Sequence, residues 1–170
     1  QYESLPFLVT QCTIANLTNY STHSQSRVGG IWLDNWNNLI INQNTIFNLT
    51  AYSSNNQSGS QASVIGIHMQ FQLLNSDCLD NTIYNLSNLS TLPTISYGTS
   101  VYGILFRGSN NLANDVARNY IHSLSVETTL TNPTSRIAGI YINSGTATYA
   151  NNIISLGDNS TSRTLIYGIY

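Results

Sequence analysis

Charge is the component that this sequence most clearly lacks. Only 7% of its 170 residues are charged, lysine is absent, and five arginines supply all the positive charge. Soluble proteins average about 25% charged residues. A chain so poor in cations has no basic patch that could neutralise phosphate groups. The composition therefore argues against nucleic acid as a partner.

Long apolar runs are missing as well. No stretch approaches the length of apolar sequence that a transmembrane helix needs, so we expect no membrane span. There is no signal-peptide pattern, and the chain begins at Gln1 without a methionine, which favours a mature product or a piece of a longer chain. Cys12 and Cys78 could pair, but they fall in different repeats, and we expect two buried free thiols.

Motifs for metal binding and nucleophilic catalysis are also absent. His23, His68 and His122 stand in three different contexts without metal-ligand spacing, so we expect surface histidines, no metal and no cofactor. The sequence contains no Ser-His-Asp order, phosphate loop or Cys-x-x-Cys pair. These absences exclude the commonest cofactor and metal chemistries.

What the sequence does contain is asparagine, 23 residues in all, against a background that is 41% hydrophobic. Regular spacing of Ile, Leu and Val argues against a disordered polar tract. Asparagine in ordered chains often stacks in register, so that the side-chain amides bond one another. The composition therefore favours a fold that forms ladders.

Two short motifs repeat in step along the chain. A Gly-Ile pair recurs with its glycine at Gly30, Gly66, Gly103, Gly139 and Gly168, at spacings of 36, 37, 36 and 29 residues. An Asn-x-Ile-x-x-Leu motif alternates with it, beginning at Asn44, Asn81, Asn119 and Asn151, with a degenerate first copy at Cys12. Both motifs are β-branched, alternating and bounded by Asn, Ser and Gly, which is typical of strands. Apolar residues at helical spacing are missing, which excludes helical repeats.

Stacking of these repeats as coils of a parallel β-helix accounts for the residue choices. Equivalent positions of successive coils would form columns about 4.8 Å apart. One inward column would contain Ile31, Ile67, Ile104, Ile140 and Ile169, and a second would contain Ile46, Ile83, Ile121 and Ile153. The asparagines would stack where the chain turns, and the glycines would lie where a Cβ would crowd the next coil. Propeller blades are a weaker alternative, because they need four strands per repeat where we find two or three.

Sequence between the motifs varies in length. We expect loops on one side of the solenoid at residues 51–63, 87–100, 125–135 and 157–165, which are rich in Ser, Thr and Asn. Specific contacts usually form on such loops.

With these motifs, the chain resembles the right-handed parallel β-helix of the pectin-lyase-like superfamily, and especially repeats of large secreted and surface-anchored bacterial proteins. The resemblance covers nearly all of the chain, residues 1–170, as a single segment of about five coils. It implies a right-handed, all-β solenoid and an extracellular or cell-surface location. The motifs are specific for the fold and say almost nothing about activity.

The superfamily includes lyases and hydrolases that act on acidic polysaccharides, so the carboxylates are the first candidates for chemistry. The seven are Glu3, Asp34, Asp77, Asp80, Asp115, Glu127 and Asp158. Asp34 shares a column with Gln70, Arg107 and Asn143, which offers one carboxylate where glycoside hydrolysis needs two. Asp77 and Asp80 are close in sequence, but we interpret them as part of a polar turn. No catalytic residues are therefore assigned.

An outward aromatic row is the better candidate for binding. It follows the Gly-Ile pair and contains Trp32, His68, Leu105, Tyr141 and Tyr170, and the neighbouring outward column adds Tyr102 and Tyr167. Exposed rings about 5 Å apart would form a platform for sugars or for a partner surface. The alternative is that these side chains cover one another or pack under a loop. Seven Asn-x-Ser/Thr sequons, from which we infer no glycans, lie at Asn16, Asn19, Asn48, Asn56, Asn85, Asn88 and Asn159.

Two functions are consistent with these sequence features. The first is a non-catalytic structural or adhesive module of a larger extracellular protein, with a polysaccharide or a cell-surface partner. The second is a polysaccharide lyase or glycoside hydrolase whose site lies partly outside this segment. Because the chain opens and stops inside repeats, we also expect flanking coils or end-to-end self-association.

Overall fold

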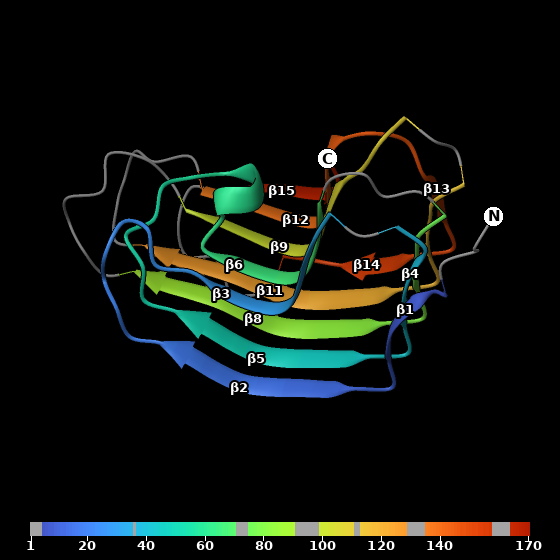
Figure 1. The fold of residues 1–170 in the computed structure, drawn as a ribbon. Helices are drawn as coiled ribbons and strands as arrows, with labels where there is room; N and C mark the ends of the chain where they lie inside the picture. The colour runs from blue at the N-terminus through green and yellow to red at the C-terminus, as the bar shows by residue number, and fades with distance from the viewer. Residues whose placement is uncertain are drawn as a thin grey trace.

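The computed structural model describes residues 5–35, 37–70, 75–90, 99–110, 113–128, 135–157 and 164–170. They form a parallel β-solenoid whose coils each contribute three strands (Figure 1). Three sheets of five strands run along the solenoid, and neighbouring coils pair in parallel throughout. The predicted all-β solenoid is confirmed, and five strands per sheet agree with the expected count of about five coils. One of the three sheets, called sheet A below, has strands of only three or four residues.

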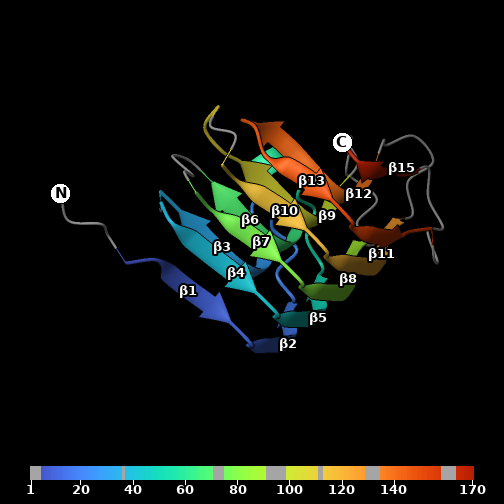
Figure 2. The same cartoon turned by 90° about the vertical axis from the view of Figure 1, so that its right-hand side faces the viewer.

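The strands follow one another around each coil in the order A, B, C. Sheet A, which faces the viewer in Figure 2, contains β1 (Phe7–Thr10), β4 (Leu39–Asn42), β7 (Asp77–Leu79), β10 (Asp115–Ala117) and β13 (Thr148–Ala150). Sheet B contains β2 (Thr13–Asn19), β5 (Thr45–Ala51), β8 (Thr82–Ser90), β11 (Tyr120–Thr128) and β14 (Ile153–Ser155). Sheet C contains β3 (Val28–Asp34), β6 (Val64–Gln70), β9 (Ser100–Arg107), β12 (Ser135–Ser144) and β15 (Thr164–Ile169). A short 3-10 helix, η1 (Gly59–Gln61), lies between β5 and β6.

Two isoleucine columns form the core, as the repeat predicted. Members of the sheet C column pair in register, and those of the inner coils are buried. In sheet B the register is wrong for the last coil, because Ile121 pairs with Ile154 and Ile153 is 64% exposed. Because two isoleucines are consecutive here, the motif fits with either one facing inward, and the motif alone could not decide between the two.

The corner between sheets A and B is a single residue in the left-handed conformation, followed by an inward asparagine. Gln11, Gln43, Asp80, Arg118 and Asn151 occupy this left-handed position, with φ between 54° and 56°. Asn151 is therefore the corner residue, and Asn152 rather than Asn151 continues the buried column. The same one-residue shift places the Ile154 side chain inside the solenoid.

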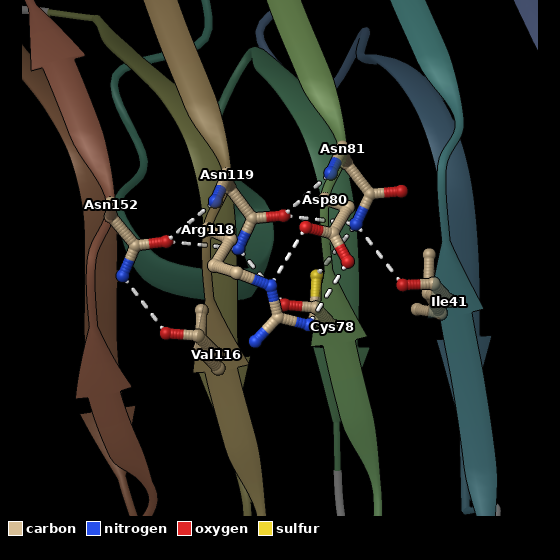
Figure 3. Close-up of polar contacts among 8 residues, drawn as sticks. All are labelled: Ile41, Cys78, Asp80, Asn81, Val116, Arg118, Asn119 and Asn152. Carbon is tan, nitrogen blue, oxygen red and sulfur yellow. Dashed lines mark hydrogen bonds and ion pairs between the residues drawn. The ribbon is translucent and has the colours of Figure 1, made fainter.

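Buried asparagines behind this corner form a continuous ladder (Figure 3). The main-chain N–H and the side-chain amide of Asn81 both donate to Oδ1 of Asn119, at 3.0 Å each. Asn44 donates to Asn81 in the same way, and Asn119 to Asn152. Each side chain also donates to a main-chain carbonyl of sheet A in the preceding coil. The ladder thus pairs the polar groups of a buried turn, as expected.

Glycine in the sheet C motif is required by close approach between coils. A Cβ on Gly66 would lie 2.6 Å from the carbonyl oxygen of Gly103 and 2.7 Å from Cγ2 of Ile83. Similar contacts surround Gly103 and Gly139, whereas nothing lies within 4 Å at Gly168 on the terminal strand. The predicted crowding is confirmed for the inner coils.

Several other expectations need correction. β8 and β11 extend to Ser90 and Thr128, so the loops expected from residues 87 and 125 begin later, and most of residues 157–165 lies outside the described segments. The two cysteines are free and on different coils, but only Cys78 is buried; Cys12 is exposed on the first coil, at the place of a ladder asparagine. Burial raises the pKa of the Cys78 thiol.

The terminal coils expose residues whose counterparts are buried in the inner coils. Leu17 is 41% exposed at one end, and Ile166 and Ile169 are 43% and 49% exposed at the other. Within the described residues, no helix has the length and apolarity that a membrane crossing requires.

Candidate ligand-binding surface

The predicted aromatic row lies on the outer face of sheet C in the expected register. Across the strands it runs through Trp32, His68, Leu105 and Tyr141, with Tyr170 beside Tyr141 on the last strand. Trp32 is 38% and Tyr170 46% exposed, and Tyr141 and Tyr167 are half-buried. His68 and Tyr102, in contrast, have no exposed surface. The prediction that all three histidines lie at the surface is therefore wrong for His68.

The segment between β5 and β6 accounts for the burial of Tyr102. Ala62 packs with Ile65, Tyr102, Leu105 and Ala138 in a second apolar cluster on the outer side of sheet C. η1 lies near β12, since a Cβ on Gly59 would be 3.5 Å from Oδ1 of Asn143. The Tyr102 and Tyr141 rings stack at 4.5 Å, and Tyr141 in turn contacts Tyr170 at 5.2 Å. The middle of the expected platform is thus a small hydrophobic core, and the exposed rings, Trp32 and Tyr170, lie at the two ends of the row.

Buried His68 belongs to a polar cluster at the edge of this face. Its Nε2 lies 3.2 Å from Oε1 of Gln70, and its Nδ1 lies 3.8 Å from Oδ1 of Asp34. Trp32 donates from Nε1 to Asp34 and packs its ring against the imidazole, with centroids 3.9 Å apart. Burial is the largest influence on the His68 pKa and lowers it below 6.5, with smaller lowering effects from Arg27 and Arg107, whereas Asp34 and the Gln70 hydrogen bond oppose the shift.

This shift predicts a loss of stability in mild acid. Because the folded-state pKa of His68 lies below the ordinary value of 6.5, the stabilisation is complete above pH 6.5 and is lost as the pH falls toward the folded-state value. We expect the melting temperature to decrease over that range and His68→Leu to reduce the decrease. Thermal melts of both proteins between neutral and mildly acidic pH test this. His23→Gln, at an exposed histidine, should keep the wild-type slope; equal slopes for wild type and His68→Leu would contradict the assignment.

The carboxylate column also differs from the expectation. Asp34, Gln70 and Arg107 align, but a bulge in β12 puts Ser144 beside Arg107 in place of Asn143. Glu3 and Asp158 lie outside the described residues. Asp80 forms a two-point ion pair with Arg118, at 2.8 and 3.0 Å, which supports its interpretation as part of a polar turn (Figure 3).

Asp77 and Asp115 are a carboxylate pair that sequence reasoning did not find. They are register neighbours on β7 and β10, although 38 residues separate them in the sequence. Burial raises the pKa of the Asp77 carboxyl first, the negative charge of Asp115 raises it further, and Arg118 opposes both. Among the described residues, no group of three or more His, Cys, Asp or Glu side chains could hold a metal ion.

A polar groove lies on the outside of sheet B. A second column of left-handed residues bends these strands, with φ between 53° and 60° at Asn16, Asn48, Asn85 and Ser123. The bend is visible where β2, β5, β8 and β11 turn near their carboxyl ends in Figure 1. It hollows the outer surface of the sheet into a cavity of about 380 Å³ that spans β5, β8 and β11.

Hydroxyl and amide groups line this groove in rows. The lining residues are Asn48, Thr50, Asn85, Ser87, Leu89, Ser123, Ser125 and Glu127. Asn85 donates to Asn48 at 3.2 Å, Asn48 donates to Asn16 at 2.9 Å, and the Thr50 and Ser87 hydroxyls are 3.2 Å apart. Each amide has two N–H donors and uses one within the row, so hydrogen-bonding capacity remains on the open side.

An aromatic stack borders the groove. Phe47, Tyr84 and His122 are register neighbours just before the bend, with ring centroids 4.9 and 5.0 Å apart and interplanar angles of 2° and 5°. The rings cover one another's faces, so their main role is to join adjacent coils. They also form an apolar edge beside the polar rows.

One signal in the sequence could have located this groove. The Asn-Leu-Ser/Thr triplet recurs at Asn16, Asn48 and Asn85, where we counted it only as sequons. Asparagine tolerates the left-handed conformation better than most residues, so its recurrence at one repeat position indicates a bend in each coil. The Ser or Thr two places later then falls on the outer wall of the groove.

Comparison with protein-family models, with curated proteins and with solved structures finds no match to this chain.

Proposed function

We propose that the chain is a non-catalytic structural or adhesive module that binds a polysaccharide in the groove of sheet B. One observation carries the proposal: a row of hydroxyls on three successive coils and a row of amides on two of them line an open cavity of about 380 Å³. Polysaccharides present hydroxyl groups at regular intervals along their chain. A groove with donors and acceptors at regular intervals complements such a ligand, and the rigid strands hold those groups in place.

The setting that we propose for this module is extracellular or at a cell surface. Support comes from the lysine-free, charge-poor composition and from the coil motifs, which resemble the right-handed helices of the pectin-lyase-like superfamily. We also propose that further coils or a second copy cover the terminal strands, because inward-facing Ile169 is 49% exposed there.

Native affinity electrophoresis through gels cast with different polysaccharides tests the binding function. We expect at least one polysaccharide to retard the protein and leave an intact gel. A variant without the groove hydroxyls, Thr50→Val with Ser87→Ala and Ser125→Ala, should lose roughly tenfold or more in affinity, because each lost hydrogen bond contributes about 1 kcal/mol.

A matched control is available on the same sheet. Thr13, Thr45 and Thr82 form another threonine column across three coils, outside the groove lining. Replacing these three by valine should leave the retardation unchanged. Free migration of the wild type on every gel, or equal losses in both triple variants, would contradict a groove-specific function.

The Asp77–Asp115 pair favours a second candidate, a polysaccharide hydrolase or lyase. Two neighbouring carboxylates, one with a raised pKa, are the arrangement that acid–base hydrolysis of glycosides uses. A cleared zone behind the protein in the same gels would support it, provided that Asp77→Asn abolishes the clearing. An intact gel under a retarded band would support the binding module instead.

A further inference from the structure

The groove of sheet B also carries information about which polysaccharide it would take. We infer that it binds a neutral, unbranched polysaccharide whose chain runs along the solenoid axis, with successive sugars on successive coils. This inference rests on the proposed function, since it names the ligand class of the same site. It departs from the acidic substrates that the family resemblance implies.

The direction of the ligand follows from where the groove repeats itself. Along the axis, hydroxyls repeat on all three coils at Thr50, Ser87 and Ser125, and amides repeat on two, at Asn48 and Asn85. Along a single strand such as β8, by contrast, the lining positions Asn85, Ser87 and Leu89 differ in size and polarity. The axial repeat is about 4.8 Å, close to the length of one pyranose unit. A linear chain that lies along the axis would therefore place one sugar, with hydroxyls to bond, at each coil.

Neutrality follows from the charges that line the groove. Among the described residues that line the groove, Glu127 is the one with a charge and none is an arginine. It lies at the β11 end, in register with Leu89 on β8. A uronic acid there would place a second carboxylate beside Glu127 without a cation to offset the repulsion. Sugars without charge meet hydrogen-bonding partners along the groove and no such repulsion at Glu127.

Three coils line the groove, so the affinity should depend on ligand length. Trimers should bind more tightly than dimers, and longer oligomers should add little, because residues of only β5, β8 and β11 contribute. Isothermal titration calorimetry with β-1,4-linked glucose and mannose oligomers measures this series. Equal affinities for dimers and trimers would overturn the axial orientation.

Charge selection is tested with galacturonic acid oligomers of the same lengths. Wild-type protein should bind the neutral trimers at least tenfold more tightly than the acidic trimer. Glu127→Gln should raise the affinity for the acidic trimer roughly tenfold and change the affinities for neutral trimers by less than twofold. Asp34→Asn removes an equal charge from sheet C, outside the groove lining, and should change neither.

The outcomes separate the inference from the function on which it rests. If the wild type bound the acidic trimer more tightly than the neutral trimers, and only the groove variants lost this binding, selection for neutral sugars would be overturned. The binding function of the groove would then still stand. Absence of binding to every oligomer and every polysaccharide would overturn both. A gain of acidic binding in Asp34→Asn equal to that in Glu127→Gln would show a general charge effect and would also overturn selection by the groove.

Discussion

Substitution of Gly103 by alanine is expected to destabilise the solenoid by about 3 kcal/mol or more. The added Cβ would lie 2.6 Å from the carbonyl oxygen of Gly139 on the next coil and 2.6 Å from Cγ2 of Ile121 in sheet B. Neither neighbour can yield easily, because the carbonyl is part of the backbone of the paired strand and Ile121 is fully buried. The coil could relieve these contacts by moving the Gly139 strand away or by moving Ile121, and either movement would separate packed layers.

Urea denaturation of Gly103→Ala and Gly168→Ala makes the comparison quantitative. Gly168 occupies the same column on the terminal strand, where a Cβ would meet nothing within 4 Å. Its alanine variant should be neutral or slightly stabilising, since alanine restricts the unfolded chain. Equal stability of the two variants would contradict the close approach of the inner coils.

Substitution of Asn81 by alanine should cost about 3–5 kcal/mol, because it leaves several buried polar groups without partners at once. The main-chain N–H and the side-chain amide of Asn44 would lose their shared acceptor, and the Ile41 carbonyl would lose its donor. Asn81 has no exposed surface, so water could not replace these bonds without opening the coil.

Two measurements check the Asn81 prediction. Denaturant midpoints give the loss of stability, with Asn37→Ala as the control, since Asn37 is exposed and outside the ladder. Native-state hydrogen exchange gives a local readout: the Asn44 amide should exchange much faster in Asn81→Ala. If Asn44 kept its protection in a variant of wild-type stability, the ladder would not contribute to the fold.

The repeating part of the fold could be predicted because each column restates one physical requirement. Ile67 and Ile104 are buried, and Gly66 and Gly103 avoid a clash with the next coil. Asn81 bonds the asparagines of neighbouring coils. Each of these requirements recurs on every inner coil, so each appears in the sequence as a repeated residue. The frame of the last coil could not be predicted, because Asn151 and Asn152 both satisfy the motif. Only the left-handed conformation of Asn151 distinguishes the corner from the ladder.

The candidate sites were harder to predict, because they depend on parts of the coil that do not repeat. Tyr102 is buried under a segment that includes Ala62, and the Gly-Ile motif contains no trace of that segment. The pairing of Asp77 with Asp115 depends on a third strand too short to recognise by alternation. The groove depends on a bend at Asn48 and Asn85, which two-residue alternation cannot represent.

The asparagine ladder has a direction, and this direction restricts how solenoids of this kind could join. From Cys12 through Asn44 to Asn152, every step donates N–H groups toward the later coil and accepts them from the earlier one. A coil added beyond Asn152 would have to present an amide carbonyl to continue the series. Two copies joined by their late ends would oppose donor to donor, so a junction through this column would have to be head-to-tail, as in a filament with unlike ends.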